Sequence, residues 1–123
     1  MSIVKKSILK CLQSFRFALR GIIYAIRQEN NFIYHLLATF TITCLGIYLE
    51  FSRMEWLIVV ICITTVYAAE IFNTAIEKLV DMVSPNHRRS AGIVKDLSAG
   101  AVLVASLGAL ICGLIILSNH FSS

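Results

Sequence analysis

Residues 69–81 read AEIFNTAIEKLVD and begin at the last residue of an uncharged apolar run, Trp56–Ala69. The helical pattern of that run continues to about Val83. At 100° per residue, one stripe of this helix carries Glu70, Asn73, Glu77 and Asp81. Carboxylates within a membrane helix are costly, so the stripe predicts a functional site.

Depth along the helix separates the roles of these carboxylates. If the span starts near Trp56, about 20 residues bring it to the inner membrane boundary close to Glu77. Glu70 then lies about 10 Å deeper, two helical turns away. A partly desolvated carboxylate at that depth suits a proton acceptor, whereas a carboxylate at the headgroup level can meet a hydrated cation.

The composition of the whole chain indicates a membrane protein. Hydrophobic residues make up 58% of its 123 residues and the mean hydropathy is +0.80, whereas soluble domains are about 45–50% apolar. Three apolar segments predict transmembrane helices at 32–49, 56–83 and 97–117. Apolar residues at spacings of three and four predict an amphipathic helix at 3–27 that lies in the membrane interface. We therefore expect an all-α membrane protein with a single domain over residues 1–123.

Positive charges predict how the spans are oriented. Six of the eleven Lys and Arg residues precede residue 28, and a polar loop predicted at 84–96 carries three more. The short turn at 50–55 and the tail after Leu117 have no such excess. The positive-inside rule therefore places the N-terminus and the 84–96 loop in the cytoplasm, and the C-terminus outside.

Other features narrow the function by exclusion. The basic leader is followed by long apolar runs, which favours an anionic membrane surface over nucleic acid as its partner. Charges interrupt the leader, so we expect no cleavable signal peptide. Neither a GxxxxGK[ST] loop nor the glycine-rich loop of protein kinases is present. The cysteines are widely spaced, which favours apolar packing over a zinc site or disulfide framework: Cys11, Cys44, Cys62 and Cys112.

Two further segments can reach the carboxylate stripe from the cytoplasmic side. Glu29 ends the amphipathic helix just before the first span, and Lys95 and Asp96 open the third. Glu29 and Glu77 together would give the sparse carboxylate ligation that Mg²⁺ prefers when phosphates and waters complete its shell. Lys95 could offset phosphate charge. Alternatively, these residues pair only with one another in the core of an oligomer.

The stripe has the pattern Glu70-x-x-Asn73-Thr74-Ala75-Ile76-Glu77-x-x-Val80-Asp81, which resembles the signature of the prokaryotic diacylglycerol kinase and undecaprenol kinase family. Gly21, the Glu29…His35 segment and Lys95-Asp96-x-x-Ala99 resemble family segments in the same order, so the likeness covers nearly the whole chain. The resemblance implies a homotrimer of the bacterial inner membrane with sites shared between subunits. It also implies phosphorylation of a lipid alcohol with ATP and Mg²⁺.

The same resemblance implies roles for individual residues. Glu70 would be the catalytic base, and Glu29 and Glu77 would hold the metal. Ala99 and His35, together with Glu70, would bind the lipid, although His35 could instead bond a neighbouring helix. The implied nucleotide-binding residues are Lys10, Phe17, Asn73, Asp81, Asn86, His87, Arg88, Lys95 and Asp96. The best-known diacylglycerol kinases have Arg in place of Lys10 and Tyr in place of Phe17.

Resemblance to subgroups also narrows the lipid alcohol. The run at 99–103 and the Glu29…His35 segment look more like the undecaprenol kinases of Gram-positive bacteria, which makes undecaprenol the first choice and diacylglycerol the alternative. A non-catalytic membrane subunit with a cation-binding acidic stripe would leave Asn73 and Lys95 without a task. A membrane-active peptide would leave the two later spans without a purpose.

Overall fold

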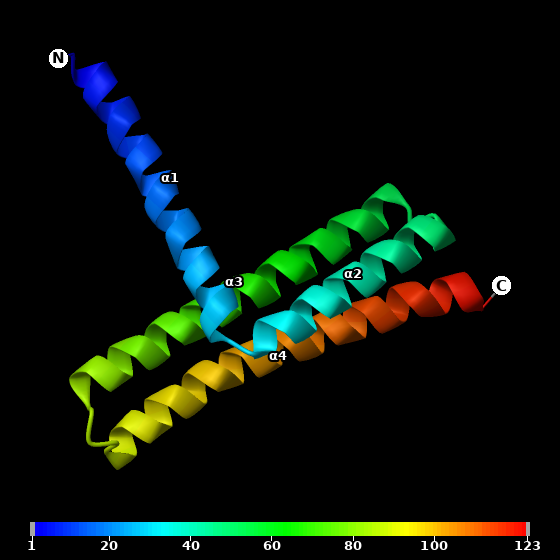
Figure 1. Cartoon of the computed structure of the whole chain (residues 1–123). Coiled ribbons are helices and arrows are strands. Elements are labelled where there is room, and N and C mark those ends of the chain that lie inside the picture. Colours follow the sequence, from blue (N-terminus) through cyan, green and yellow to red (C-terminus); the bar gives the residue numbers. More distant parts are fainter. Residues whose placement is uncertain (1, 123) are drawn as a thin grey trace.

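Four helices account for nearly all of the chain. A computed structural model describes residues 2–122, and these residues contain no strand (Figure 1). In chain order the helices are α1 (Ile3–Gln28), α2 (Asn31–Leu49), α3 (Arg53–Val83) and α4 (Arg89–Phe121). The last three are each long and apolar enough to cross a membrane. The prediction of an all-helical protein with three apolar spans is therefore confirmed.

The three apolar helices lie side by side, and α3 and α4 form the longest pair (Figure 1). They run antiparallel from the turn that joins them to the opposite end of the bundle. The shorter α2 accompanies only the first half of α3, and α1 leaves this layer at a steep angle. The second half of α3, which carries the polar stripe, therefore lies against α4 and close to the junction between α1 and α2.

Short sequence signals set several helix ends. Ser52 and Glu55 form a capping box at the start of α3, because Ser52 Oγ accepts from the Glu55 N–H (3.2 Å) and Glu55 Oε1 accepts from the Ser52 N–H (2.9 Å). Ser2 Oγ caps α1 by accepting from the Lys5 N–H (3.2 Å). Glu50 adopts the left-handed region (φ 55°) at the end of α2, so the chain reverses tightly into α3.

A cluster at the end of the bundle far from the polar stripe ties all three apolar helices together. Phe51 is buried, and its ring centroid lies 5.4 Å from that of Trp56 and 5.2 Å from that of His120. His120 Nε2, near the end of α4, lies 3.0 Å from Glu55 Oε2 on α3. Gly46 of α2 is buried against the Trp56 ring. The C-terminal end of α4 is thus fixed to the α2–α3 turn.

The polar segment between the second and third spans differs from the sequence prediction. The sequence predicts a loop at 84–96, but α4 already begins at Arg89 and continues to Phe121. Similarly, α3 begins at Arg53 rather than at residue 56. Hydropathy detects where a helix enters apolar surroundings. Charged residues such as Arg and Lys also have high helix propensity, so a helix can begin before its apolar segment. The loop is therefore only 84–88.

The apolar stripe of α1 is left uncovered by the rest of the described chain. Its residues Ile8, Leu12, Phe15 and Leu19 are each more than half exposed. An uncovered apolar stripe opposite a basic face is typical of a helix that lies in a membrane interface. That location, like the orientation of the spans, stays a prediction.

Gly46 provides a test of the packing at the far end. A methyl group at this position would lie 2.5 Å from the Trp56 ring and 2.8 Å from the Phe51 ring. We expect Gly46→Ala to lower the free energy of unfolding by about 1–3 kcal/mol, because both rings are packed and must shift. A denaturant titration in detergent micelles measures this change.

The matched control is Gly108→Ala, since nothing lies within 4 Å of a methyl group placed there. It replaces a helix-interior glycine without a clash, so we expect a change of at most about 1 kcal/mol, towards greater stability. Equal losses in the two variants would contradict the packing described for Gly46.

Candidate functional site

Glu70 is the most deeply buried charged side chain among the described residues, with 1% of it exposed. It projects from the middle of α3 towards the start of α2, where His35 Nε2 lies 2.8 Å from Glu70 Oε1. The second oxygen, Glu70 Oε2, is buried and has no hydrogen-bond partner within the described chain. A buried carboxylate oxygen without a partner is costly and is typical of a functional site.

A column of polar contacts continues from Glu70 along the interface between α3 and α4. Ser98 Oγ donates to Asn73 Oδ1 (2.7 Å), and Asn73 Nδ2 donates to Glu77 Oε1 at a longer 3.4 Å. One turn further, Lys95 Nζ lies 2.6 Å from Asp81 Oδ1. Asn73 and Asp81 of the predicted stripe therefore contact α4, whereas Glu70 contacts α2 and Glu77 bonds to Asn73 of its own helix.

Glu29 reaches the same column from the α1–α2 junction. Burial raises the pKa of the Glu29 carboxyl above its ordinary value of 4.5, and the nearby carboxylates of Glu77 and then Glu70 raise it further, against an opposing effect of Thr74. The repulsion means that carboxylates from two separate segments of the chain converge.

The convergence of Glu29 and Glu77 suits a divalent cation. Within residues 2–122, no cluster of three or more His, Cys, Asp or Glu side chains could enclose a metal ion. Two carboxylates beside phosphate oxygens and waters are, however, the ligand set that Mg²⁺ commonly uses. A bound cation would also remove the repulsion that raises the Glu29 pKa. The residues present therefore fit Mg²⁺ held jointly with a phosphate-bearing ligand.

The structure brings some of the sequence-predicted site residues together and leaves others apart. The residues that converge are Glu29, His35, Glu70, Asn73, Glu77, Asp81 and Lys95. Asn86, His87 and Arg88 lie in the turn between α3 and α4, and Asp96 and Ala99 are exposed on α4. Lys10 and Phe17 are exposed on α1, which points away from the column (Figure 1). Within one chain these two do not reach the other predicted nucleotide-binding residues.

Two features of the site were not predicted from the sequence. Ser98 lies one turn after Lys95 on α4 and fixes Asn73, and its spacing of three from Lys95 places both on one helix face. The contact between His35 and Glu70 joins residues 35 positions apart. The spacing of Ser98 was a usable signal, whereas the second contact depends on how α2 and α3 pack.

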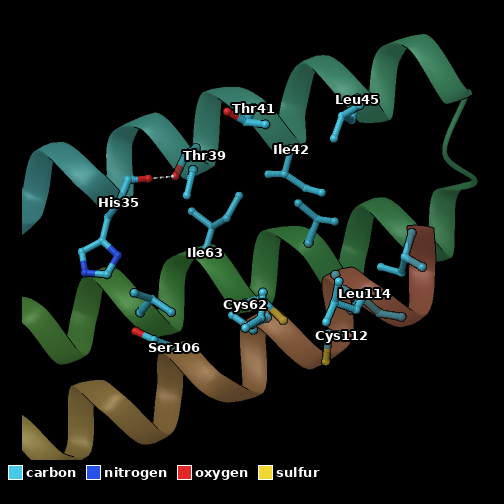
Figure 2. Close-up of a pocket in the computed structure, with 18 of the residues that line it drawn as sticks. His35, Thr39, Thr41, Ile42, Leu45, Cys62, Ile63, Ser106, Cys112 and Leu114 are labelled. Carbon is cyan, nitrogen blue, oxygen red and sulfur yellow. Dashed lines mark hydrogen bonds between the residues drawn. The ribbon is translucent and has the colours of Figure 1, made fainter. Parts of the chain in front are cut away.

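An apolar pocket of about 470 Å³ opens beside His35 between α2, α3 and α4 (Figure 2). His35 and Thr39 mark its polar end, where Thr39 Oγ1 and the Tyr67 hydroxyl are 2.7 Å apart. From there the pocket runs past Ile42 and Ile63 towards Leu114, and most of the residues in its wall are aliphatic. A polar end beside a long apolar wall suits an amphiphile with a hydrocarbon tail.

Three helices long and apolar enough to cross a membrane, with one fully buried carboxylate in a column of polar side chains, indicate an integral-membrane protein with a functional site inside the bundle. The family model described as prokaryotic diacylglycerol kinase matches residues 16–117, and the chain belongs to this family of lipid kinases. It is therefore a kinase and a multi-pass membrane protein.

Three relatives illustrate the range of the family. The undecaprenol kinase of Bacillus subtilis is 38% identical over 104 residues, which are 85% of this chain and 85% of the relative. The diacylglycerol kinase of Escherichia coli is 33% identical over 97 residues, covering 79% and 75% of the two chains. The diacylglycerol kinase of Synechocystis is 33% identical over 103 residues, which span 83% of this chain but only 59% of the relative.

The bond between Ser98 and Asn73 gives a prediction about the polar column. Ser98→Ala removes the 2.7 Å hydrogen bond and leaves a buried amide oxygen unsatisfied, so we expect it to cost about 1–3 kcal/mol of unfolding free energy. Ser118→Ala is the control, because that exposed hydroxyl bonds only to its own helix, at the Ile115 carbonyl. A loss in Ser98→Ala no larger than in the control would contradict the role of Ser98.

The raised Glu29 pKa gives a second prediction. In the absence of divalent cations, we expect Glu29→Gln to unfold at a higher temperature than the unchanged chain at neutral pH, because it removes a partly buried charge and the repulsion of that charge from Glu77 and Glu70. A carboxyl whose pKa is raised by folding destabilises the folded state when ionised, and this penalty disappears as the pH falls through the raised pKa towards 4.5. The advantage of the variant should therefore vanish on acidification.

Thermal unfolding in micelles at several pH values measures this effect. Adding Mg²⁺ should stabilise the unchanged chain more than Glu29→Gln. Glu50→Gln is the control, since Glu50 is exposed at the far end of the bundle. An advantage of Glu29→Gln that persisted at low pH would show that the charge of Glu29 is not its cause.

Proposed function

We propose that this lipid kinase transfers the γ-phosphoryl group of ATP, with Mg²⁺, to undecaprenol at the cytoplasmic face of the bacterial inner membrane. The observation that carries the proposal is the buried, unpartnered oxygen of Glu70 beside two converging carboxylates. Diacylglycerol is the alternative substrate, because relatives at 33% identity are diacylglycerol kinases. A non-catalytic subunit is no longer an alternative, since the family consists of kinases.

In the proposed reaction, Glu70 is the general base. The O–H bond of the lipid alcohol breaks and its proton passes to Glu70 Oε2. The hydroxyl oxygen forms a bond to the γ-phosphorus, and the bond from that phosphorus to the bridging oxygen breaks with its electron pair leaving on ADP. Phosphoryl transfer of this kind relies mainly on positioning and electrostatic stabilisation rather than on covalent catalysis.

The other residues of the column would hold the nucleotide. Glu29 and Glu77 would hold Mg²⁺, which offsets negative charge on the phosphates when it is bound. Lys95, paired with Asp81, places a cation at the same end of the column. The remaining nucleotide contacts that we propose are Lys10, Phe17, Asn73, Asn86, His87, Arg88 and Asp96.

The tail of the substrate would follow the apolar pocket from its polar end at His35. A lipid of the inner leaflet has its hydroxyl at the cytoplasmic interface and its tail directed towards the bilayer midplane. The pocket has the same polarity, because Glu70 lies near its polar end and the aliphatic wall continues towards the far end of the bundle (Figure 2). We also assign Ala99 to the lipid-binding surface.

We further propose that the enzyme is a homotrimer with its N-terminus in the cytoplasm. A row of small residues along α4, which would allow close approach of another helix, supports self-association: Ala101, Ala105, Ala109 and Gly113. Excess positive charge in α1 and in the 84–96 segment supports the orientation. A neighbouring subunit would complete the nucleotide site that Lys10 and Phe17 do not reach within one chain.

The proposed function is tested by phosphate transfer from labelled ATP in mixed micelles. Undecaprenol and diacylglycerol are offered separately to the purified protein, each with and without Mg²⁺. We expect Mg²⁺-dependent labelling of undecaprenol. Labelling of diacylglycerol alone would favour the alternative substrate, and labelling of neither lipid by folded protein would contradict the proposal.

Glu70→Gln tests the general base within the same assay. The amide keeps the size of the side chain but cannot accept the proton, so we expect kcat to fall by about 10²–10⁴-fold. Glu50→Gln, at the far end of the bundle, should retain the unchanged rate. Comparable activity in Glu70→Gln and the unchanged enzyme would exclude Glu70 as the base.

A further inference from the structure

The two oxygens of the buried Glu70 carboxylate have different surroundings. Oε1 lies 2.8 Å from His35 Nε2, whereas Oε2 is buried without a hydrogen-bond partner in the described chain. A general base must start as an ionised carboxylate, which only accepts hydrogen bonds; if Glu70 is the base, His35 Nε2 therefore carries the proton in this contact. His35 therefore occupies one oxygen of the carboxylate and leaves the other available.

The imidazole ring of His35 is held by its neighbours on α2 and α3. Its plane stands at 82° to the ring of Tyr67, with the ring centroids 6.3 Å apart. The Tyr67 ring is itself stacked on buried Phe32, with centroids 5.8 Å apart, and its hydroxyl lies 2.7 Å from Thr39 Oγ1. Thr39 in turn donates to the His35 carbonyl (2.7 Å). The Tyr67 ring, itself held by Phe32 and Thr39, thus packs edge-on against the imidazole and limits its rotation, which helps to fix the direction of the N–H.

We propose that His35 is a positioning residue, which holds Glu70 Oε1 so that Oε2 is the oxygen that accepts the proton of the lipid alcohol. The inference rests on the proposed function, because it requires Glu70 to act as the base. A carboxylate free to rotate would present either oxygen in many orientations, whereas reaction needs one orientation relative to the bound hydroxyl. His35 acts through Glu70 and takes no part in bond making or breaking.

The far end of the bundle provides a matched control. His120 and Glu55 form a second histidine–glutamate contact between helices at 3.0 Å, and the two histidines have nearly equal exposure, 22% for His120 and 21% for His35. Loss of either histidine removes one such contact. Only His35 contacts the carboxylate that we propose as the base.

The test compares His35→Ala, His35→Gln and His120→Ala in the micellar kinase assay. We expect His35→Ala to lower kcat by about 10- to 100-fold while the KM for ATP changes less than about twofold. His35→Gln should recover a large part of the rate, because its side-chain amide can donate to the same oxygen. His120→Ala should keep the unchanged kcat, although its unfolding temperature falls.

The alternative outcomes are distinguishable. A higher KM for the lipid with unchanged kcat in His35→Ala would mean that His35 only lines the lipid pocket, and would overturn the inference. Equal loss of kcat in His35→Ala and His120→Ala would reduce its role to helix packing and would also overturn it. If the unchanged enzyme transfers no phosphate, the proposed function fails and the inference with it. If Glu70→Gln is inactive but His35→Ala keeps the unchanged kcat, the proposed function stands and only the inference fails.

Discussion

The structure depends on keeping polar side chains inside a bundle of apolar helices. Each buried polar group in such surroundings destabilises the protein unless it has a partner, so the helices must pack in a register that supplies one. The Asn73 carbonyl oxygen is satisfied by Ser98 on α4, and one of the two Glu70 oxygens by His35 on α2. These two contacts fix α3 against both neighbours at the depth of the site. The polar column thus specifies the packing of the helices as well as the chemistry.

The two ends of the bundle differ in their interactions: one is closed by packing, and the other carries the site. The far end is closed by aromatic packing of Phe51 on Trp56 and His120, and its glutamate is shared between a capping box and the His120 contact. The end that carries the site leaves Glu70 Oε2 unsatisfied and brings Glu29 towards Glu77 despite their like charge. An unsatisfied buried oxygen and repulsion between like charges both lower the stability of the fold. They are characteristic of functional sites and require a rigid scaffold elsewhere. The far-end cluster provides such a scaffold.

Much of the fold could be predicted from the sequence because its signals are local. The periodicity of Glu70, Asn73 and Glu77 places them on one face of a helix whatever that helix packs against. The helix ends were less accessible, since hydropathy follows the membrane boundary and α4 begins at Arg89, well before its apolar segment. A bond from His35 to a neighbouring helix was one of the two roles expected from the sequence, but the contact with Glu70 itself could not be predicted. It depends on the offset between α2 and α3, which no local pattern encodes.

The direction of α1 bears on how a complete site can form. If one chain contained the whole nucleotide site, Lys10 and Phe17 would have to lie near the polar column, yet α1 carries them away from it (Figure 1). Their side chains and the apolar stripe of α1 are exposed, and the end of the column at Asp81 is open as well, with 54% of that side chain exposed. A second copy of the chain that packs along the small residues of α4 could supply the missing wall. The exposed leader and the incomplete enclosure of the column therefore support the same proposal, an enzyme whose sites lie between subunits.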